Sequence, residues 1–174
     1  MAEKGAKSLD YGHNCKPVRV DRKHAQQVMN QFVGAYQLPA EAGAELIANL
    51  FSRDGRFTNP VVEKIGRTDI RDYFLLLLSN EFWGNQYLII RTLAWDQEKQ
   101  IGSVEVTWFA TAKVAEPKIG NTPLAGVVIG QGISQDQSFS FGFDRHGLMT
   151  YMHQYFNPGQ SQAFVYTGTY PCVQ

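Results

Sequence analysis

Four polar side chains stand where a small site could use them. Asn59 sits between an apolar strand and Pro60, and Glu63 follows in the next loop. An amide at position 59 can donate and accept hydrogen bonds, but it cannot take up a proton at neutral pH. Asn59 either orients a ligand or satisfies the turn before Pro60, and the residues leave both roles open. For Glu63 a solvated loop carboxylate is favoured over an acid–base role.

The last apolar strand carries the other two polar candidates, His153 and Gln154. His153 is the only histidine inside a regular strand, which makes it a candidate proton carrier. Strand alternation instead places it on the outer face and favours an interface or structural role, although a single β-bulge would reverse that assignment. Gln154 either binds a substrate carbonyl or hydroxyl or packs as a buried amide, and both roles stay open.

Composition excludes several other classes. The 16 basic and 16 acidic residues balance, so we expect no nucleic acid partner and no anionic membrane surface. The longest apolar run, "YFLLLL", is too short to span a bilayer, and the N-terminus lacks the apolar core of a signal peptide, so we expect a soluble cytoplasmic protein. Histidine and cysteine spacing predicts no metal site, and nothing indicates an organic cofactor. Cys15 and Cys172 are expected to be reduced thiols.

Hydrophobic periodicity predicts three helices followed by a run of strands. Asp21 caps the first helix, Pro39 opens the second, whose buried face includes Phe51, and Thr68 caps the third. Four segments rich in β-branched and aromatic residues follow, at 86–95, 103–114, 127–143 and 148–156. This order predicts an α+β domain over 21–158, with a flexible arm at 1–20 and an extension at 159–174.

Three stretches resemble a known superfamily. They are "LFSRDGRFTNPV" (50–61), "GRTDIRDYF" (66–74) and "FDRHGLMTYMHQYF" (143–156). The chain resembles the nuclear transport factor-like superfamily, specifically ketosteroid isomerases and SnoaL-like polyketide cyclases, over about residues 22–158. The resemblance implies a cone-shaped α+β barrel, with three N-terminal helices packed on a curved, mainly antiparallel sheet. It also implies a pocket between helices and sheet, and a homodimer.

The residues that carry ketosteroid isomerase chemistry do not carry over. By the resemblance, the general base falls on Asn59, the oxyanion tyrosine on Phe32 and the protonated aspartate on Phe139. Two supporting tyrosines match Phe51 and Phe74. A phenyl ring cannot stabilise an enolate by hydrogen bonding, so we do not expect ordinary ketosteroid isomerase chemistry.

Strand alternation predicts which side chains face the cone. The inward set is Val104, Val106, Trp108, Gln137, Phe139, Phe141, Thr150, Met152, Gln154 and Phe156. The outward set is Glu105, Asp136, Tyr151, His153 and Tyr155, on the face where dimers of the family pack. The predicted pocket is apolar with a few neutral amides and hydroxyls, and it suits a largely hydrophobic ligand.

Two functions follow, from different classes. The first is an isomerase or cyclase of secondary metabolism, which acts on a hydrophobic polycyclic or isoprenoid-like metabolite by preorganising it. Its polar assistance would come from Asn59, Gln154, Glu63 and His153. Its predicted substrate-binding residues are Phe32, Phe51, Phe74, Val104, Val106, Trp108, Phe139, Phe141, Met152 and Phe156. The alternative is a non-catalytic binder of hydrophobic ligands, or a dimerisation module, on the same fold.

Overall fold

A computed structural model describes residues 19–119 and 121–164. Cys15, Cys172 and most of the predicted N-terminal arm lie outside the described residues. The helices are α1 (Arg22–Ala35), α2 (Ala40–Asn49), α3 (Arg67–Leu78) and the short 3₁₀ helix η1 (Pro158–Gln160). The strands are β1 (Phe51–Thr58), β2 (Glu63–Ile65), β3 (Trp83–Asp96), β4 (Ile101–Ala112), β5 (Lys118–Ile119), β6 (Thr122–Pro123), β7 (Gly132–Phe143), β8 (Met149–Phe156) and β9 (Gln162–Phe164).

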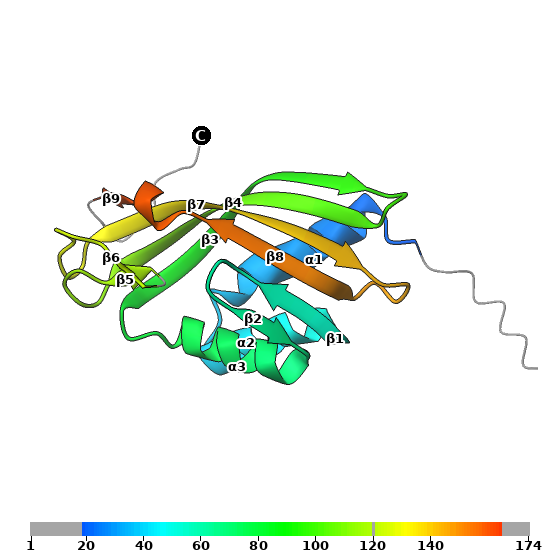
Figure 1. The fold of residues 1–174 in the computed structure, drawn as a ribbon, viewed down its shortest axis with the longest axis horizontal. Coiled ribbons are helices and arrows are strands. Elements are labelled where there is room, and N and C mark those ends of the chain that lie inside the picture. The colour runs from blue at the N-terminus through cyan, green and yellow to red at the C-terminus, as the bar shows by residue number, and fades with distance from the viewer. Residues whose placement is uncertain (1–18, 120, 165–174) are drawn as a thin grey trace, which may run out of the picture.

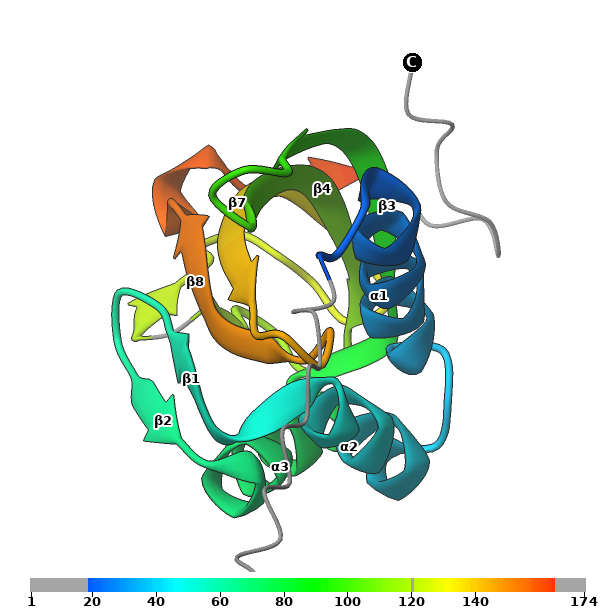
Figure 2. The same cartoon turned by 90° about the vertical axis from the view of Figure 1, so that its right-hand side faces the viewer.

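One curved sheet carries the architecture, in the order β2-β1-β8-β7-β4-β3, with β9 added beside β7. All its pairings are antiparallel except that of β1 with β8, and β5 and β6 form a separate hairpin. Figures 1 and 2 show the sheet curling around the side where α1, α2 and α3 lie. The predicted α+β cone is confirmed. The predicted barrel is not, because no pairing among the described strands joins β2 to β3 and the sheet stays open.

The helix boundaries follow local chemistry, with two corrections to the sequence prediction. Asp21 caps α1 by accepting a hydrogen bond from the backbone N–H of His24 at 2.8 Å, as predicted. Phe51 was predicted on α2, but α2 ends at Asn49 and Phe51 is the first residue of β1. Thr68 was predicted as the cap of α3, but it already lies inside that helix. The cap position is Gly66, whose φ of 85° favours glycine.

Aromatic rings fill the space between helices and sheet. Phe32, Phe57, Phe74 and Phe139 are fully buried and meet edge-to-face, with ring centroids of Phe57 and Phe74 5.0 Å apart and those of Phe32 and Phe139 5.4 Å apart. Such edge-to-face pairs add about 0.5–1.5 kcal/mol each beyond the burial of their area. This cluster ties α1 and α3 to β1 and β7.

A β-bulge changes the predicted alternation at the start of β8. The register of β7 against β8 passes from Gly142 opposite Tyr151 to Phe143 opposite Met149. Thr150 is therefore the extra residue of the bulge. Met149 is fully buried and Thr150 is exposed, so the predicted inward position of Thr150 is wrong.

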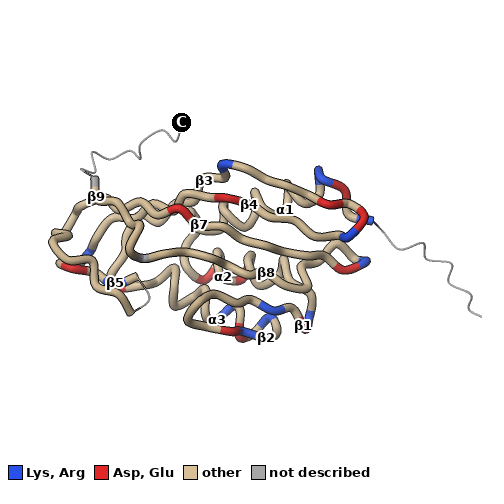
Figure 3. The backbone as a smooth tube through the Cα atoms, turned by 45° about the horizontal axis from the view of Figure 1, so that its top comes forward, with Lys and Arg blue, Asp and Glu red and all other residues tan. Residues whose placement is uncertain are grey.

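Charged residues of both signs are interspersed around the periphery (Figure 3). Among the described residues, no helix is long and apolar enough to cross a membrane. None of the described residues form a group of three His, Cys, Asp or Glu side chains that could hold a metal ion.

Removal of the α1 cap is expected to lower the stability of the domain. Asp21→Ala leaves the His24 N–H without its side-chain acceptor, and we expect a loss of about 1 kcal/mol in the free energy of unfolding. Urea unfolding measures this loss. Asp21→Asn keeps an acceptor oxygen and should retain most of the stability, and an equal loss in both variants would contradict the capping role.

Candidate functional site

A cavity of about 230 Å³ lies between the sheet and the helices, beside the β5–β6 hairpin. Its lining comes from α3, from strands β3, β4, β5, β7 and β8, and from the segments after α1, β1 and α3, which the curvature of the sheet brings together. The lining residues are Tyr36, Asn59, Val61, Tyr73, Leu77, Asn80, Phe82, Trp83, Trp108, Lys118, Ile119, Gln135, Gln137, Gln154 and Phe156.

The structure divides the predicted site residues into three groups. Asn59, Gln154, Trp108 and Phe156 line the cavity. The other predicted substrate-binding residues are packed in the hydrophobic core and do not line it: Phe32, Phe51, Phe74, Val104, Val106, Phe139, Phe141 and Met152.

Glu63 and His153 form the third group, because neither lines the cavity. The Glu63 side chain is 46% exposed and forms an ion pair with Arg56. His153 lies outside the cavity, where Nδ1 is hydrogen-bonded to the Thr58 hydroxyl and the ring lies 4.2 Å from that of Tyr155. The structure therefore does not bring either residue together with Asn59.

Asn59 is held by both ends of its amide. It is 8% exposed, and its Oδ1 accepts hydrogen bonds from the backbone N–H groups of Val61 and Val62, both at 2.9 Å. Its Nδ2 donates to the Tyr73 hydroxyl at 2.9 Å and to Gln154 Oε1 at 3.4 Å. The turn role left open by the sequence is thus observed, and the same side chain also faces the cavity.

A row of neutral amides continues from Asn59 across the sheet. Gln154 Nε2 donates to Gln137 Oε1 at 2.9 Å, and Gln137 Nε2 donates to Gln135 Oε1 at 3.0 Å. Gln135 Nε2 ends the row on the backbone carbonyl of Asn157 and the Ser161 hydroxyl, both at 3.2 Å. We call Asn59, Gln154, Gln137 and Gln135 the amide relay. Each of these amides is at least partly buried and hydrogen-bonded, as burial of polar groups requires.

The sequence prediction missed two tyrosines, Tyr36 and Tyr73, whose side chains line the cavity. Burial raises the pKa of Tyr36, with the nearby Tyr73 as a second cause, so its hydroxyl stays neutral. Burial also raises the pKa of Tyr73, and the hydrogen bond from Asn59 partly offsets that rise. Tyr36 lies four residues after Phe32 on the same helical face. Its position in the apolar stripe of the first helix already indicated that its side chain faces the interior.

Apolar walls complete the site. Trp83 and Trp108 meet edge-to-face at 5.1 Å, and the indole N–H of Trp108 is satisfied by Gln86 Oε1 at 3.2 Å. Trp83 Nε1 donates to the carbonyl of Lys118, which fastens the β5–β6 hairpin beside the cavity. Among the described residues, Lys118 is the only charged one in the lining, and neither a carboxylate nor an imidazole lines the cavity.

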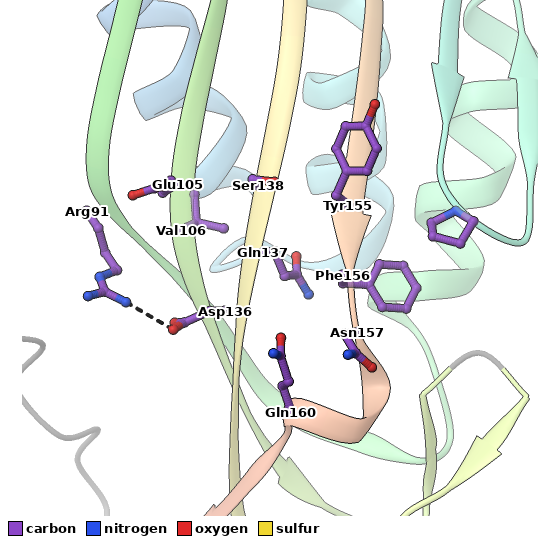
Figure 4. Close-up of a pocket in the computed structure, with 11 residues that line it drawn as sticks. Arg91, Glu105, Val106, Asp136, Gln137, Ser138, Tyr155, Phe156, Asn157 and Gln160 are labelled. Atoms are coloured by element: carbon purple, nitrogen blue, oxygen red, sulfur yellow. Dashed lines mark hydrogen bonds and ion pairs between the residues drawn. The ribbon is translucent and has the colours of Figure 1, made fainter.

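A second hollow, of about 460 Å³, lies on the outer face of the sheet (Figure 4). Arg91 and Asp136 form an ion pair there at 3.0 Å, and Glu105 and Tyr155 line the same hollow, as the predicted alternation requires. Gln137 and Phe156 line both this hollow and the cavity. The cavity and the outer hollow therefore share the wall that these two side chains form.

Solved structures share this fold. The epoxide hydrolase/cyclase-like enzyme SalBIII, described for its role in pyran ring formation in the polyether salinomycin, is 14% identical, with 82% of this chain and 97% of that chain covered and a TM-score of 0.60. A candidate polyketide cyclase from Xanthomonas campestris pv. campestris is 15% identical, with 78% and 92% covered and a TM-score of 0.57. A hypothetical protein from Catenulispora acidiphila DSM 44928 with a ketosteroid isomerase-like fold, in complex with trimethylamine, is 14% identical, with 74% and 84% covered and a TM-score of 0.55.

No family model and no curated protein matches the sequence. The structural likenesses confirm the nuclear transport factor-like fold that the resemblance predicted. Identities this low show the fold, and the reaction has to be argued from the site itself.

The buried phenol of Tyr36 predicts a specific loss of stability in alkali. Unfolding returns its pKa to about 10, so above that pH the unfolded state releases a proton that the native state keeps. Stability therefore falls as pH rises, by about 1.4 kcal/mol at pH 11 for one such group. Urea unfolding at pH 8 and pH 11 should show a smaller alkaline loss for Tyr36→Phe than for the wild type. Tyr155→Phe alters an exposed ring and should keep the wild-type loss. An alkaline loss unchanged in Tyr36→Phe would contradict the buried phenol.

Proposed function

We propose that this chain, built on the fold of ketosteroid isomerase-like and polyketide cyclase structures, is an isomerase or cyclase of a hydrophobic small molecule that binds in the cavity. The observation that carries the proposal is the pair of neutral phenols, Tyr36 and Tyr73, in a cavity whose described lining holds no carboxylate. The fold neighbours with cyclase descriptions support the reaction class.

The proposed chemistry uses hydrogen-bond donation in place of a strong base. Tyr36 and Tyr73 would donate to a substrate oxygen and stabilise the negative charge that develops on it. The Trp83 and Trp108 rings would hold the carbon skeleton in a reactive fold. Isomerisation and ring closure need no net proton from the protein, since the proton that leaves one substrate atom can end on another. A site without a carboxylate suits such a reaction.

The cavity volume narrows the proposed substrate. Sites for drug-sized ligands usually span roughly 300–1,000 Å³, and this one is about 230 Å³. We therefore favour a substrate whose buried part has one or two rings over a larger polycyclic skeleton. Gln154 and Asn59 have most of their hydrogen bonds inside the protein, so in this proposal they act mainly by holding the phenols and the cavity wall.

Removal of either phenol is expected to reduce turnover by about 10²-fold, the usual effect of losing one oxyanion donor. The assay would incubate the protein with neutral one- and two-ring enones and hydroxy-epoxides. Chromatography with mass detection would then follow products of unchanged mass. Tyr36→Phe and Tyr73→Phe should lower kcat, whereas Tyr155→Phe, on the outer face, should keep it. Equal kcat in all three variants would contradict the assignment of the phenols.

The alternative function is a binder without catalysis, and the absence of a carboxylate and an imidazole from the described part of the lining favours it. A binder would be stabilised by the ligand without making product, by about 2.7 kcal/mol when ligand is at 100 times its Kd. Thermal stabilisation by a panel compound that is recovered unchanged would favour this function over the enzyme.

We further propose that two copies associate through the outer face of the sheet, as the resemblance implies. The 54% exposed ring of Tyr155, next to the Arg91–Asp136 pair, supports this surface. Light scattering should report a dimer for the wild type and a shift toward monomer for Tyr155→Glu, which places a carboxylate beside Glu105 and Asp136. Thr150→Glu adds the same charge at an exposed residue of the β8 bulge, outside that hollow, and should stay dimeric. A monomeric wild type would overturn the proposal.

A further inference from the structure

We infer that Asn59 sets the direction in which the Tyr73 hydroxyl donates, and thereby makes the cavity selective for a ligand oxygen that accepts hydrogen bonds. The inference rests on the proposed function only in placing a small molecule in this cavity. It concerns binding, so it can be tested without knowing the reaction.

The first step is that the Asn59 amide can have only one orientation. The backbone N–H groups of Val61 and Val62 both point at its Oδ1, at 2.9 Å. An amide turned by 180° would set its own NH₂ against these two donors and leave all of them without acceptors. The turn would replace two hydrogen bonds, each worth about 1 kcal/mol, by two N–H groups facing N–H groups, so the observed orientation is strongly favoured. The Asn59 NH₂ therefore faces Tyr73 and Gln154.

The second step concerns the hydrogen of the Tyr73 hydroxyl. Its oxygen accepts from Asn59 Nδ2 at 2.9 Å, so the O–H bond cannot point along that direction. No other hydrogen bond joins this hydroxyl to a residue in the described part of the chain. Since Tyr73 lines the cavity, its hydrogen is available to a ligand there.

The third step is that the far end of the amide relay enforces the same direction. Gln135 Nε2 faces the backbone carbonyl of Asn157, which can only accept. Between these two fixed ends, Gln137 and Gln154 cannot turn singly, because either turn would oppose N–H to N–H and C=O to C=O. The relay is therefore a one-way chain of donors that runs from Asn59 to Asn157 on one side and to Tyr73 on the other.

An aspartate at position 59 would reverse this arrangement without changing its shape. Its second oxygen could only accept, so Tyr73 would turn its hydroxyl onto it and withdraw the donor from the cavity. Gln154, Gln137 and Gln135 would have to turn as well, and the last turn would oppose Gln135 Oε1 to the Asn157 carbonyl. An amide at this position thus leaves the Tyr73 hydroxyl able to donate to a ligand in the cavity, whereas a carboxylate would accept that hydrogen bond itself.

The test compares two probes of nearly equal shape, 2-tetralone and tetralin, whose Kd values differ through the ketone oxygen. Wild type should prefer 2-tetralone, and Asn59→Asp at pH 7 should reduce that preference about three- to tenfold, the equivalent of one hydrogen bond. Tyr73→Phe should reduce it to a similar extent and leave tetralin binding nearly unchanged. The infrared C=O stretch of bound 2-tetralone should move toward its value without a hydrogen bond in both variants.

Asn157→Asp is the matched control. The Asn157 side chain is exposed and lines the outer hollow but not the cavity, and its Oδ1 accepts the Gly159 N–H, an interaction that aspartate keeps. The change adds the same charge without altering Asn59 or Tyr73, so the preference for 2-tetralone should equal that of the wild type. A loss in Asn157→Asp as large as in Asn59→Asp would mean that added charge alone reduces ketone binding, and would overturn the inference.

A measurement on the wild type covers the case in which Asn59→Asp does not fold. With ¹⁵N-labelled asparagine, the Asn59 side-chain protons should exchange slowly and show NOEs to the Tyr73 ring, unlike those of exposed Asn49. Exchange of Asn59 as fast as that of Asn49 would overturn the inference. So would a folded Asn59→Asp that keeps the full preference, or a wild type with no preference for 2-tetralone. A retained preference without any turnover would instead remove the proposed enzyme and leave this inference standing.

Discussion

Two successive backbone N–H groups, those of Val61 and Val62, bind the side-chain oxygen of Asn59, and the polar arrangement of the cavity depends on this contact. It fixes the link between β1 and β2 and leaves the amide nitrogen facing inward. That nitrogen then reaches Tyr73 on α3 and Gln154 on β8. One residue thus joins a turn, a helix and the sheet around the same cavity, and each of its four side-chain hydrogen bonds is made inside the protein.

Every polar group in the relay is neutral, and that has an energetic reason. Burial of a charged side chain costs far more than burial of a hydrogen-bonded amide, unless the charge is paired. The cavity lining offers no partner for a buried carboxylate other than Lys118, which is exposed on β5. Amides do not titrate, and burial raises the phenol pKa values of Tyr36 and Tyr73. The direction of the relay is therefore insensitive to pH near neutrality.

Hydrophobic periodicity predicted the three helices and the run of strands, the resemblance implied the cone, and strand alternation within it predicted the inward faces of β4 and β7. What failed depended on single residues. The match of Phe32 to a family tyrosine required an insertion near "AYQLPAEAG", and the phenol that reaches the cavity, Tyr36, lies one helical turn later. Thr150 was misplaced because a bulge has no reliable signature in one sequence. Gln135 shares its strand face with Gln137 and Phe139, so the alternation that selected those two residues also indicated it.

The phenylalanines that the resemblance matched to polar family residues lie in a different place from Asn59. Read one position at a time, phenyl rings at 32, 51, 74 and 139 together with an amide at 59 suggest that a polar site has been lost. The structure places the four rings in the core, and it places Tyr36, Tyr73 and the relay with Trp83 and Trp108 around the cavity beside the β5–β6 hairpin. A carboxylate at position 59 would accept a hydrogen bond from the Tyr73 hydroxyl. The Asn59 amide instead donates to that hydroxyl and leaves its hydrogen pointing toward the cavity. In the proposed function, this arrangement would favour a substrate that needs its oxygen polarised over one that needs a proton removed.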